Sequence, residues 1–484
     1  MSRTFYWFDY ETFGADARRD RPAQFAGLRT DENLNPIGSG EIFYCQPADD
    51  YLPDPDACVI TGITPFTCLD EGLPEANFAQ KIYQRFSEPE TIGVGYNNIR
   101  FDDELTRFMF WRNLIPPYAR EFGSGRGRFD LFNLIYAVYA FKPDTLKWPR
   151  REDGLYSLKL EHLSKENQID HSHAHDALSD VKATLGLARL IKERQPKLWN
   201  YALSLIDKQT TTRILNSAIP LLMINPFVGQ AKHYLSLIYP MMPNPNKPNE
   251  WFCWDLSHDP KQLQFLTSQD VKERLYVSKE KRDQGVEPIP IITLRLNQQP
   301  FVVKASPYMT PDNEQLLDVT KAEMNQRVAW FHNTDLTFLH GLWAEVADNL
   351  KERSVAEQAD VESSLYSIGF PSFKDKQLFE SLRQLSAEEL ADRVRTVEFE
   401  NSAFDDLLLR YRARNFPETI EDPEEAEKWQ RYRAERLITG RDKSLTFDEF
   451  FRKIEVLRIE RPDQMELLEE LSDYGENFQS EFML

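Results

Sequence analysis

The sequence predicts an α/β domain with a mixed sheet, followed by a small β domain and a helical carboxyl-terminal region. Three observations predict this order. The first 195 residues alternate strand-like and helix-like segments. Short β-like pieces then run from Ile219 to about Ala305, and the chain is helical and charged beyond Thr334. A length of 484 residues exceeds one ordinary core and indicates roughly two to four domains.

In the first domain, three strand-like segments precede any helix, so the sheet should contain both parallel and antiparallel pairs. The expected strands are residues 5–11, 24–30, 41–46 and 91–96. The expected helices are residues 77–86, 103–112, 130–140, 157–167 and 177–194. The Gln195-Pro196 step ends the last of these helices.

The β-like region contains two clear strand candidates, residues 251–254 and 289–296. The proline-rich segment 240–248, which precedes both within this region, is predicted to be a turn or exposed loop rather than an element. In the carboxyl-terminal region, apolar residues recur at helical spacing in residues 378–390 and 447–457. No internal repeat or long low-complexity linker separates these parts, so we expect them to pack together.

The overall charge is acidic, with 58 basic and 78 acidic residues and a net charge of −20. This balance disfavours nonspecific adhesion to nucleic acid or anionic membranes, although one groove can stay basic in such a chain. The acidic runs at 418–427 and 466–476 are interpreted as solubilising surface.

The chain has no stretch of 18 apolar residues, and its amino terminus enters a strand without an apolar leader. Four cysteines are scattered without paired spacing, which indicates neither a disulfide framework nor a zinc site. We therefore expect a cytoplasmic protein that does not associate with a membrane.

Two acidic residues, Asp9 and Glu11, lie on the first expected strand. Side chains at i and i+2 of a strand leave the same face, so both carboxylates can approach one object. Two like charges side by side are unfavourable unless a cation compensates them, and hard divalent metals prefer oxygen ligands. The pair therefore predicts metal chemistry.

A further acidic residue, Asp102, stands where a helix follows the strand at 91–96. Ligands collect at such positions in α/β sheets, so Asp102 is a candidate to complete a carboxylate cluster. Asp is also a favoured N-cap residue, and spacing alone favours the two interpretations about equally.

The third candidate piece contains His175 and Asp180. Residues five apart on a continuous helix do not face one site, but they can if His175 belongs to the loop that enters the helix. By itself such a histidine is more often a surface or packing residue. With Asp9, Glu11 and Asp102, however, it supplies what two-metal phosphodiester hydrolysis needs: hard carboxylate ligands for magnesium and a base for the attacking water.

This ordered set resembles the DEDDh 3′-to-5′ exonucleases, in which an Asp-x-Glu pair, a later Asp and a His-x4-Asp motif follow one another. The resemblance implies a ribonuclease H-like fold and two Mg²⁺ ions. It implies that Asp9, Glu11, Asp102 and Asp180 are metal ligands and that His175 is the general base. Thr61 and Gly62, within Ile60–Thr64, are similar to the segment that holds the terminal nucleotide, although a plain turn also explains them.

Longer segments are similar to the bacterial exodeoxyribonuclease I family, and the similarity runs through nearly the whole chain. They are residues 8–14, 95–104, 160–163, 175–177 and 411–417. The resemblance implies an exonuclease domain at 1–195, an SH3-like barrel domain at 196–346 and a helical domain at 350–478. It also implies a monomer that contacts single-stranded DNA and the acidic carboxyl-terminal tail of single-stranded DNA-binding protein.

Several side chains are candidates for DNA contacts by their type. Lys159, Arg107, Arg128 and Lys208 offer phosphate contacts, and Tyr118, Phe122 and Phe129 offer stacking faces. For any one of them a solvated charge or a core ring is an equally good interpretation. Tyr136 stands where the family resemblance leads us to expect a basic residue. The segment 411–417, with two arginines and two aromatic residues, is a candidate for the groove or for a protein partner.

The function predicted is magnesium-dependent degradation of single-stranded DNA from its 3′ end to 5′-mononucleotides, in DNA repair and recombination. A DEDDh ribonuclease or proofreading subunit is a weaker alternative, because such proteins usually need only the first domain. A catalytically silent nucleic-acid clamp is the alternative from another class. We expect such a clamp to have lost at least one of the five active-site residues, and all five are present.

Overall fold

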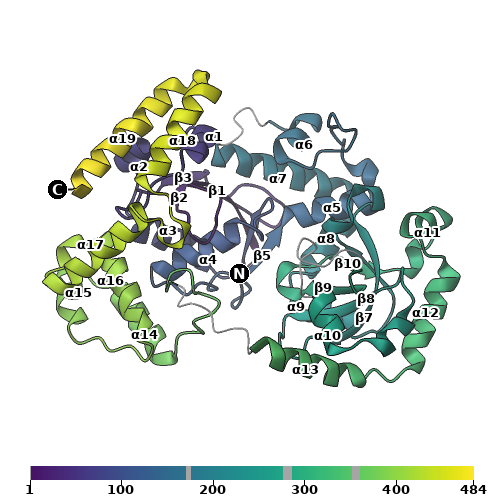
Figure 1. Ribbon diagram of the computed structural model, residues 1–484. Coiled ribbons are helices and arrows are strands. Elements are labelled where there is room, and N and C mark those ends of the chain that lie inside the picture. The colour runs from purple at the N-terminus through teal and green to yellow at the C-terminus, as the bar shows by residue number, and fades with distance from the viewer. Residues whose placement is uncertain (1, 171–175, 276–285, 352–359, 484) are drawn as a thin grey trace. The chain divides into compact units, whose positions relative to one another are not determined.

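The computed structural model (Figure 1) describes residues 2–170, 176–275, 286–351 and 360–483. The chain forms two compact units. One comprises Met1–Phe129, Lys159–Leu187 and Gln358–Leu484, and the other comprises Asp130–Leu158 and Ala188–Glu357. We call them unit 1 and unit 2. The candidate carboxylates that the structure describes, at positions 9, 11, 102 and 180, all belong to unit 1.

A five-stranded sheet forms the centre of the α/β part. Its strands, in the order β3-β2-β1-β4-β5, are β1 (Thr4–Thr12), β2 (Pro22–Thr30), β3 (Glu41–Tyr44), β4 (Thr91–Gly95) and β5 (Gly127–Asp130). Strand β1 pairs antiparallel with β2 and parallel with β4, so the predicted mixed sheet is confirmed. The four predicted strands are present, and β5 was not predicted.

The two faces of β1 differ in the side chains that they carry. Tyr6, Phe8 and Tyr10 pack into one core with helices α3 (Glu75–Ser87) and α4 (Asp102–Arg112). Because strand side chains alternate, Asp9 and Glu11 leave the opposite face. On that face Phe5 and Trp7 are buried too, so only its carboxyl-terminal end, at Asp9 and Glu11, is left for polar chemistry.

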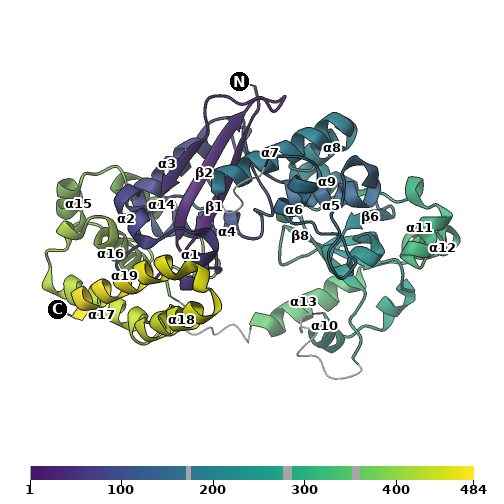
Figure 2. The ribbon, with the colours of Figure 1, turned by 90° about the horizontal axis from the view of Figure 1, so that it is seen from above.

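Two short helices, α1 (Pro55–Thr61) and α2 (Pro65–Glu71), were not predicted. Each begins with a proline at its first turn, after an Asp54 or Thr64 side chain that caps it. Their buried residues join one hydrophobic core with helices α18 (Phe447–Glu460) and α19 (Met465–Met483), and Figures 1 and 2 show these helices side by side. Distant partners therefore stabilise elements too short to be read from local pattern.

The carboxyl-terminal region of unit 1 is helical, as predicted. Before α18 and α19 it contains α14 (Phe373–Leu382), α15 (Ala387–Val394), α16 (Ala403–Asn415) and α17 (Pro423–Leu437). The apolar repeat at 378–390 does not form one helix. Ser386 caps a new helix, with a capping box to Glu389, so the chain breaks between Leu382 and Ala387.

An ion-pair network joins the α/β part of unit 1 to these helices. Arg414 of α16 donates to both carboxylate oxygens of Asp50 at 2.8 Å, and it also pairs with Glu362. Arg412 pairs with Glu425 of α17 and bonds to Thr419. The arginines of segment 411–417 are therefore held in ion pairs inside the protein, and the role of this segment in the groove or in binding a partner stays a prediction.

Unit 2 contains an antiparallel sheet in the order β10-β6-β7-β8-β9. Its strands are β6 (Leu221–Ile224), β7 (Leu235–Pro243), β8 (Glu250–Asp255), β9 (Ile291–Arg295) and β10 (Val302–Lys304). The prediction of a loop at 240–248 is wrong for its first part, because β7 continues to Pro243. A register shift between Pro240 and Met242 lets the strand accept a residue without an N–H.

The helices of unit 2 complete this description. They are α5 (Leu131–Phe141), α8 (Pro196–Ser204), α9 (Lys208–Leu215), α10 (Ser268–Arg274), α11 (Pro311–Leu317), α12 (Lys321–Asn333) and α13 (Phe338–Lys351). Helices α6 (Leu160–Glu166) and α7 (Ala177–Arg194) follow α5 along the chain. Among all described helices, none combines the length and the apolar character that a membrane span needs.

Candidate active site

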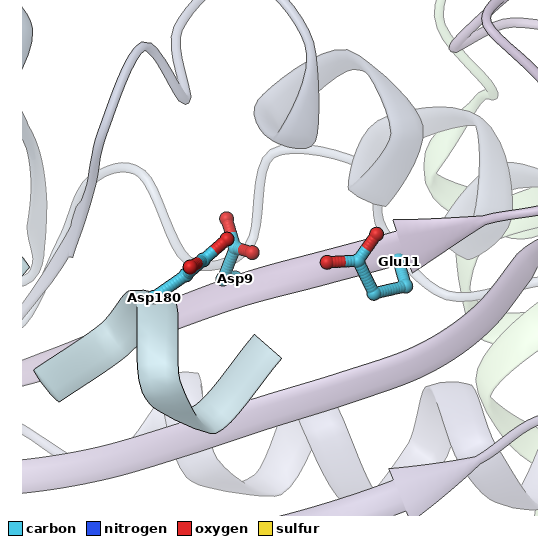
Figure 3. A group of neighbouring side chains, drawn as sticks. All are labelled: Asp9, Glu11 and Asp180. Atoms are coloured by element: carbon cyan, nitrogen blue, oxygen red, sulfur yellow. The ribbon is translucent and has the colours of Figure 1, made fainter. Parts of the chain in front are cut away.

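Three carboxylates meet on the polar side of β1. Asp9 and Glu11 extend from the strand, and Asp180 approaches from the first turns of α7 (Figure 3). Each offers one oxygen, and these oxygens lie within 4.8 Å of one another. Three hard oxygen donors at this separation suit a divalent cation such as Mg²⁺ or Mn²⁺.

The neighbouring strand fixes the helix that carries Asp180. Gln24 of β2 lies opposite Glu11 in the strand register. Its side-chain oxygen accepts a hydrogen bond from the backbone N–H of Ala177 at 3.2 Å, at the start of α7. Asp176 then accepts from the N–H of Ser179 at 3.0 Å, in the manner of a helix cap. The first turn of α7 is thus attached to the strand pair that bears the acidic residues.

Asp102 is the first residue of α4, and Phe101 occupies the cap position before it. The N-cap interpretation of Asp102 is therefore wrong. The carboxylate is buried, with 6% of its surface exposed. It lies close enough to Asp9 and Glu11 to raise the pKa of both. Asp102 therefore acts electrostatically on the cluster of Asp9, Glu11 and Asp180, and its role as a metal ligand stays a prediction.

The electrostatics of the cluster call for a cation. Burial, followed by the charges of Asp102, Glu11 and Asp180, raises the pKa of Asp9 well above its ordinary value. Burial and the charges of Asp180 and Asp102 raise the pKa of Glu11 to about 8. Without a counter-ion these groups repel one another, so the site favours either protons or a metal ion.

The adjacent Asp103 has the opposite environment. Its buried carboxylate receives hydrogen bonds from Arg120 and, at 2.6 Å, from Arg128. Burial raises the pKa of the Asp103 carboxyl, but the two guanidinium groups outweigh burial and lower it to about 2. Asp103 therefore anchors α4 through ion pairs, whereas the charge of Asp102 acts on Asp9 and Glu11.

His175 lies outside the described residues, so its predicted role as general base stays a prediction. The described chain resumes at Asp176, one residue later. Gln24 and the anchor at Asp103 were not singled out from the sequence. Gln24 is the one polar side chain in residues 22–28 of β2, and this is a signal that could have identified it.

Arg107, predicted to contact phosphate, is buried and held by carboxylates. Its Nε and Nη2 donate to Glu121 at 2.6 and 3.0 Å, and its Nη1 pairs with Glu104. Most of the N–H donors of the Arg107 guanidinium are therefore engaged by carboxylates of unit 1. Arg107 thus belongs to the ion-pair network beside α4. Its predicted contact with a phosphate stays a prediction.

The other predicted contact residues are accessible to differing degrees. Tyr118 is half-buried, with its ring below Arg107 and 6.1 Å from that of Phe370, whereas Phe122 is 65% exposed. Lys159 is exposed, and its Nζ lies 3.4 Å from the Oε1 of Glu161. Lys208, in unit 2, donates to Asn249 at 3.1 Å.

The segment predicted to hold the terminal nucleotide is the end of α1. Thr61 is its last residue, and Gly62 follows in the left-handed conformation with φ 70°. A Cβ added at Gly62 would meet no atom within 4 Å, so space is open in front of this backbone. Left-handed geometry explains the glycine without a ligand, and its role in substrate binding stays a prediction.

Comparisons with known proteins bear on this geometry. Family models described as "Exonuclease", "Exonuclease I SH3-like domain" and "Exonuclease I C-terminal domain" match residues 6–188, 207–346 and 359–478. The chain is 35% identical to exodeoxyribonuclease I of Haemophilus influenzae, over 98% of each chain. The chain belongs to the exodeoxyribonuclease I family. The predicted resemblance is confirmed, and with it the prediction of an exonuclease.

Solved structures of exodeoxyribonuclease I agree with the fold. Exonuclease I from Methylocaldum szegediense is 38% identical, with a TM-score of 0.88 over 98% of this chain and 99% of that one. E. coli exonuclease I in complex with a dA16 oligonucleotide is 33% identical, with a TM-score of 0.86 over 99% of this chain and 100% of that one. Similar structures include an ExoI/SSB-Ct complex and a zinc-bound complex of the E. coli enzyme with single-stranded DNA. The predicted ribonuclease H-like, SH3-like and helical parts are thus confirmed.

Proposed function

We propose that this protein degrades single-stranded DNA from its 3′ end to 5′-mononucleotides in a reaction that depends on Mg²⁺, and that it acts in DNA repair and recombination. The proposal assigns residues 1–195 to the exonuclease domain, 196–346 to the SH3-like domain and 350–478 to the helical domain. The cluster of Asp9, Glu11 and Asp180, whose oxygens lie within 4.8 Å, is the observation that carries the chemistry.

The proposed ligands for two Mg²⁺ ions are Asp9, Glu11, Asp102 and Asp180. Bound divalent ions would neutralise the scissile phosphate and lower the pKa of a bound water. The raised pKa values of Asp9 and Glu11 support this assignment, because ligands that repel one another gain most from a cation. Gln24 keeps Asp180 in position through the start of α7.

His175 is the proposed general base, which takes a proton from the attacking water. It follows the strand-bound carboxylates in the order of the family motif and stands five residues before Asp180. We propose Lys159, Arg107, Lys208, Tyr118, Phe122, Thr61 and Gly62 as the substrate contacts.

The direct test is digestion of a 5′-labelled single-stranded DNA oligonucleotide with and without Mg²⁺, beside an RNA of the same sequence. We expect a ladder that shortens from the 3′ end, only with metal and only on DNA. Equal digestion of the RNA would favour the ribonuclease alternative, and binding without release of nucleotides would favour the clamp.

Three variants test the residue roles. Asp9→Ala and Asp180→Ala should abolish hydrolysis in a folded protein, so activity with Mg²⁺ in either would refute the metal assignments. His175→Ala should lower kcat by about 100-fold or more with little loss of DNA affinity. An equal loss of rate and affinity would argue against a general base.

We also propose that the acidic carboxyl-terminal tail of single-stranded DNA-binding protein binds a cavity of unit 2. The cavity has a volume of about 740 Å³. Tyr201, Ile214 and Val303 contribute apolar surface, and among the described residues that line the cavity none is acidic. Four cations line it, an unusual concentration in a chain of net charge −20: Lys142, Lys197, Arg213 and Lys304.

This cavity suits a peptide that has both apolar and acidic groups. Lys304→Glu should weaken binding of a fluorescent tail peptide by roughly tenfold, because it places a like charge beside the peptide. Lys321→Glu, an exposed charge reversal on α12 of the same unit, is the matched control. Equal affinity in both variants would exclude this cavity as the tail site.

A further inference from the structure

Aromatic side chains from three segments of unit 2 gather into one cluster. Tyr136 and Tyr139 come from α5, Trp148 and Tyr156 from the segment that follows it, and His233 and Tyr234 from the turn before β7. The ring centroids of Tyr136 and Tyr234 are 4.6 Å apart, and those of Tyr139 and Tyr234 are 5.6 Å apart. Tyr139 and Tyr156 are 6.0 Å apart.

The turn that presents Tyr234 has an unusual backbone. His233 and Tyr234 both have positive φ, 48° and 60°. Two bulky residues in succession rarely adopt this left-handed conformation, and glycine or asparagine would adopt it with less strain. Strained backbone positions of this kind concentrate at active sites and ligand-binding sites.

A glutamine holds the two outer tyrosines in relation to each other. The Gln230 side chain accepts from the Tyr156 N–H at 2.7 Å and donates to the Tyr156 carbonyl at 3.1 Å. It also bonds to the Tyr234 hydroxyl at 3.2 Å. Both rings are half-buried, so each keeps part of its surface open to solvent.

A cation accompanies the outer ring. The Arg150 guanidinium lies 5.1 Å from the centroid of the Tyr156 ring, and Arg150 is exposed. Within the described part of the chain, no carboxylate is recorded as an ion-pair partner of Arg150, whereas the adjacent Arg151 pairs with Asp153. The Arg150 Nη2 also donates a hydrogen bond to the Tyr156 hydroxyl at 3.3 Å, so the cation and the ring are held together.

We propose that Tyr156 and Tyr234 form a stacking site for one base of a single-stranded DNA, and that Arg150 contacts the adjoining phosphate. Aromatic faces bind bases without regard to sequence, and a neighbouring arginine supplies the charge that the backbone needs. The site rests on the proposed function, because the same strand that is hydrolysed in unit 1 would bind it. It gives unit 2 a direct part in holding the substrate.

The test compares two substitutions of one ring. Tyr234→Leu removes the aromatic face at similar volume, whereas Tyr234→Phe keeps it and loses only the hydroxyl. Affinity for fluorescent oligo-dT is measured without metal, so that no DNA is consumed, and unfolding temperature is recorded in parallel. Phe265→Leu, which replaces a 79% exposed ring in the same unit, is the matched control.

We expect Tyr234→Leu and Tyr156→Leu to weaken binding by about fivefold or more, and Tyr234→Phe and Phe265→Leu to bind like the parent protein. Arg150→Gln should weaken binding and reduce the slope of log affinity against log salt by about one. An affinity of Tyr234→Leu equal to that of the parent would overturn the proposal. So would an equal loss in Tyr234→Phe, which would point to the hydroxyl and to packing.

Binding and digestion assays on the parent protein distinguish failure of the stacking site from failure of the proposed function. If it neither binds nor digests single-stranded DNA, the function itself fails. If it does both and the ring substitutions change nothing, only the stacking site fails.

Discussion

The Gln24 side chain accepts a hydrogen bond from the backbone N–H of Ala177, at 3.2 Å. Gln24 is 3% exposed, and it pairs in register with Glu11. One buried amide therefore connects the strand that bears two acidic residues to the helix that brings the third. Metal sites depend on such outer partners, because they fix the orientation of the ligands.

Replacing Gln24 should disturb the site without removing a ligand. Gln24→Leu leaves the Ala177 N–H without its acceptor, so α7 and Asp180 lose a fixed position. We expect the Mg²⁺ concentration for half-maximal activity to rise by about 10- to 100-fold. Gln46→Leu, an amide on the same unit that bonds to the Leu69 carbonyl, is the control. A normal Mg²⁺ dependence of Gln24→Leu would show that α7 is held by other contacts.

Neutralising one carboxylate should raise the unfolding temperature of the metal-free protein and abolish hydrolysis. Asp9→Asn preserves shape and removes a charge that is repelled by Asp102, Glu11 and Asp180. Its unfolding temperature in EDTA at pH 8 should exceed that of the parent, while hydrolysis with Mg²⁺ is lost. The exposed Glu460→Gln controls for net charge and should change neither property. A lower unfolding temperature of Asp9→Asn would contradict repulsion as the dominant effect.

The metal-free protein should lose stability as pH rises. The folded-state pKa of Glu11, about 8, lies above its ordinary value of 4.5, so the folded state holds a proton that the unfolded chain releases. Between these values the folded state is destabilised by about 1.4 kcal/mol per pH unit for such a group.

Denaturant unfolding in EDTA at several pH values measures this slope. Mg²⁺ should offset the loss at pH 8, since the carboxylates bind the metal in their ionised form. Glu11→Gln should flatten the dependence. An unchanged slope in that variant would assign the titration to another group.

Breaking the network between Asp50 and Arg414 should be costly. Arg414 is buried and donates to Asp50 and Glu362, so Arg414→Leu leaves two buried carboxylates without their main partner. We expect a loss of about 3–5 kcal/mol in the free energy of unfolding. The exposed pair of Arg395 and Glu421 supplies the control, because Arg395→Leu should cost less than about 1 kcal/mol. Similar losses in the two variants would mean that burial does not strengthen the first pair.

Much of the site followed from spacing along the chain. The alternation of aromatic and acidic residues in β1 fixed which side chains share a face, and this alone brought Asp9 and Glu11 together. The arrival of Asp102 and Asp180 depended on family order as well as on their position at helix starts. Spacing could not distinguish Asp102 from Asp103, because only the folded chain places Arg120 and Arg128 against the second of them.

The features that the sequence analysis missed or predicted wrongly have a common physical origin. Helices α1 and α2 are stabilised by α18 and α19, almost 400 residues away in sequence, so no local pattern marks them. Arg107 and Arg414 look like surface cations in the sequence, but the carboxylates that engage them come from other segments. The strand β7 continues through Pro240 because a register shift accommodates it. Each outcome depends on contacts that form only in the folded chain.

The burial of many arginines also affects the electrostatic potential outside the protein, and through it the release of the proposed product. Arg21, Arg107, Arg112, Arg120 and Arg128 are all buried among carboxylates, so they add little positive potential outside the molecule. With a net charge of −20, the exterior repels small anions except where exposed cations gather. The proposed product, a mononucleotide, is such an anion, and we expect the field to discourage its rebinding. We expect a DNA strand, which contacts many exposed cations at once, to remain bound in the same field.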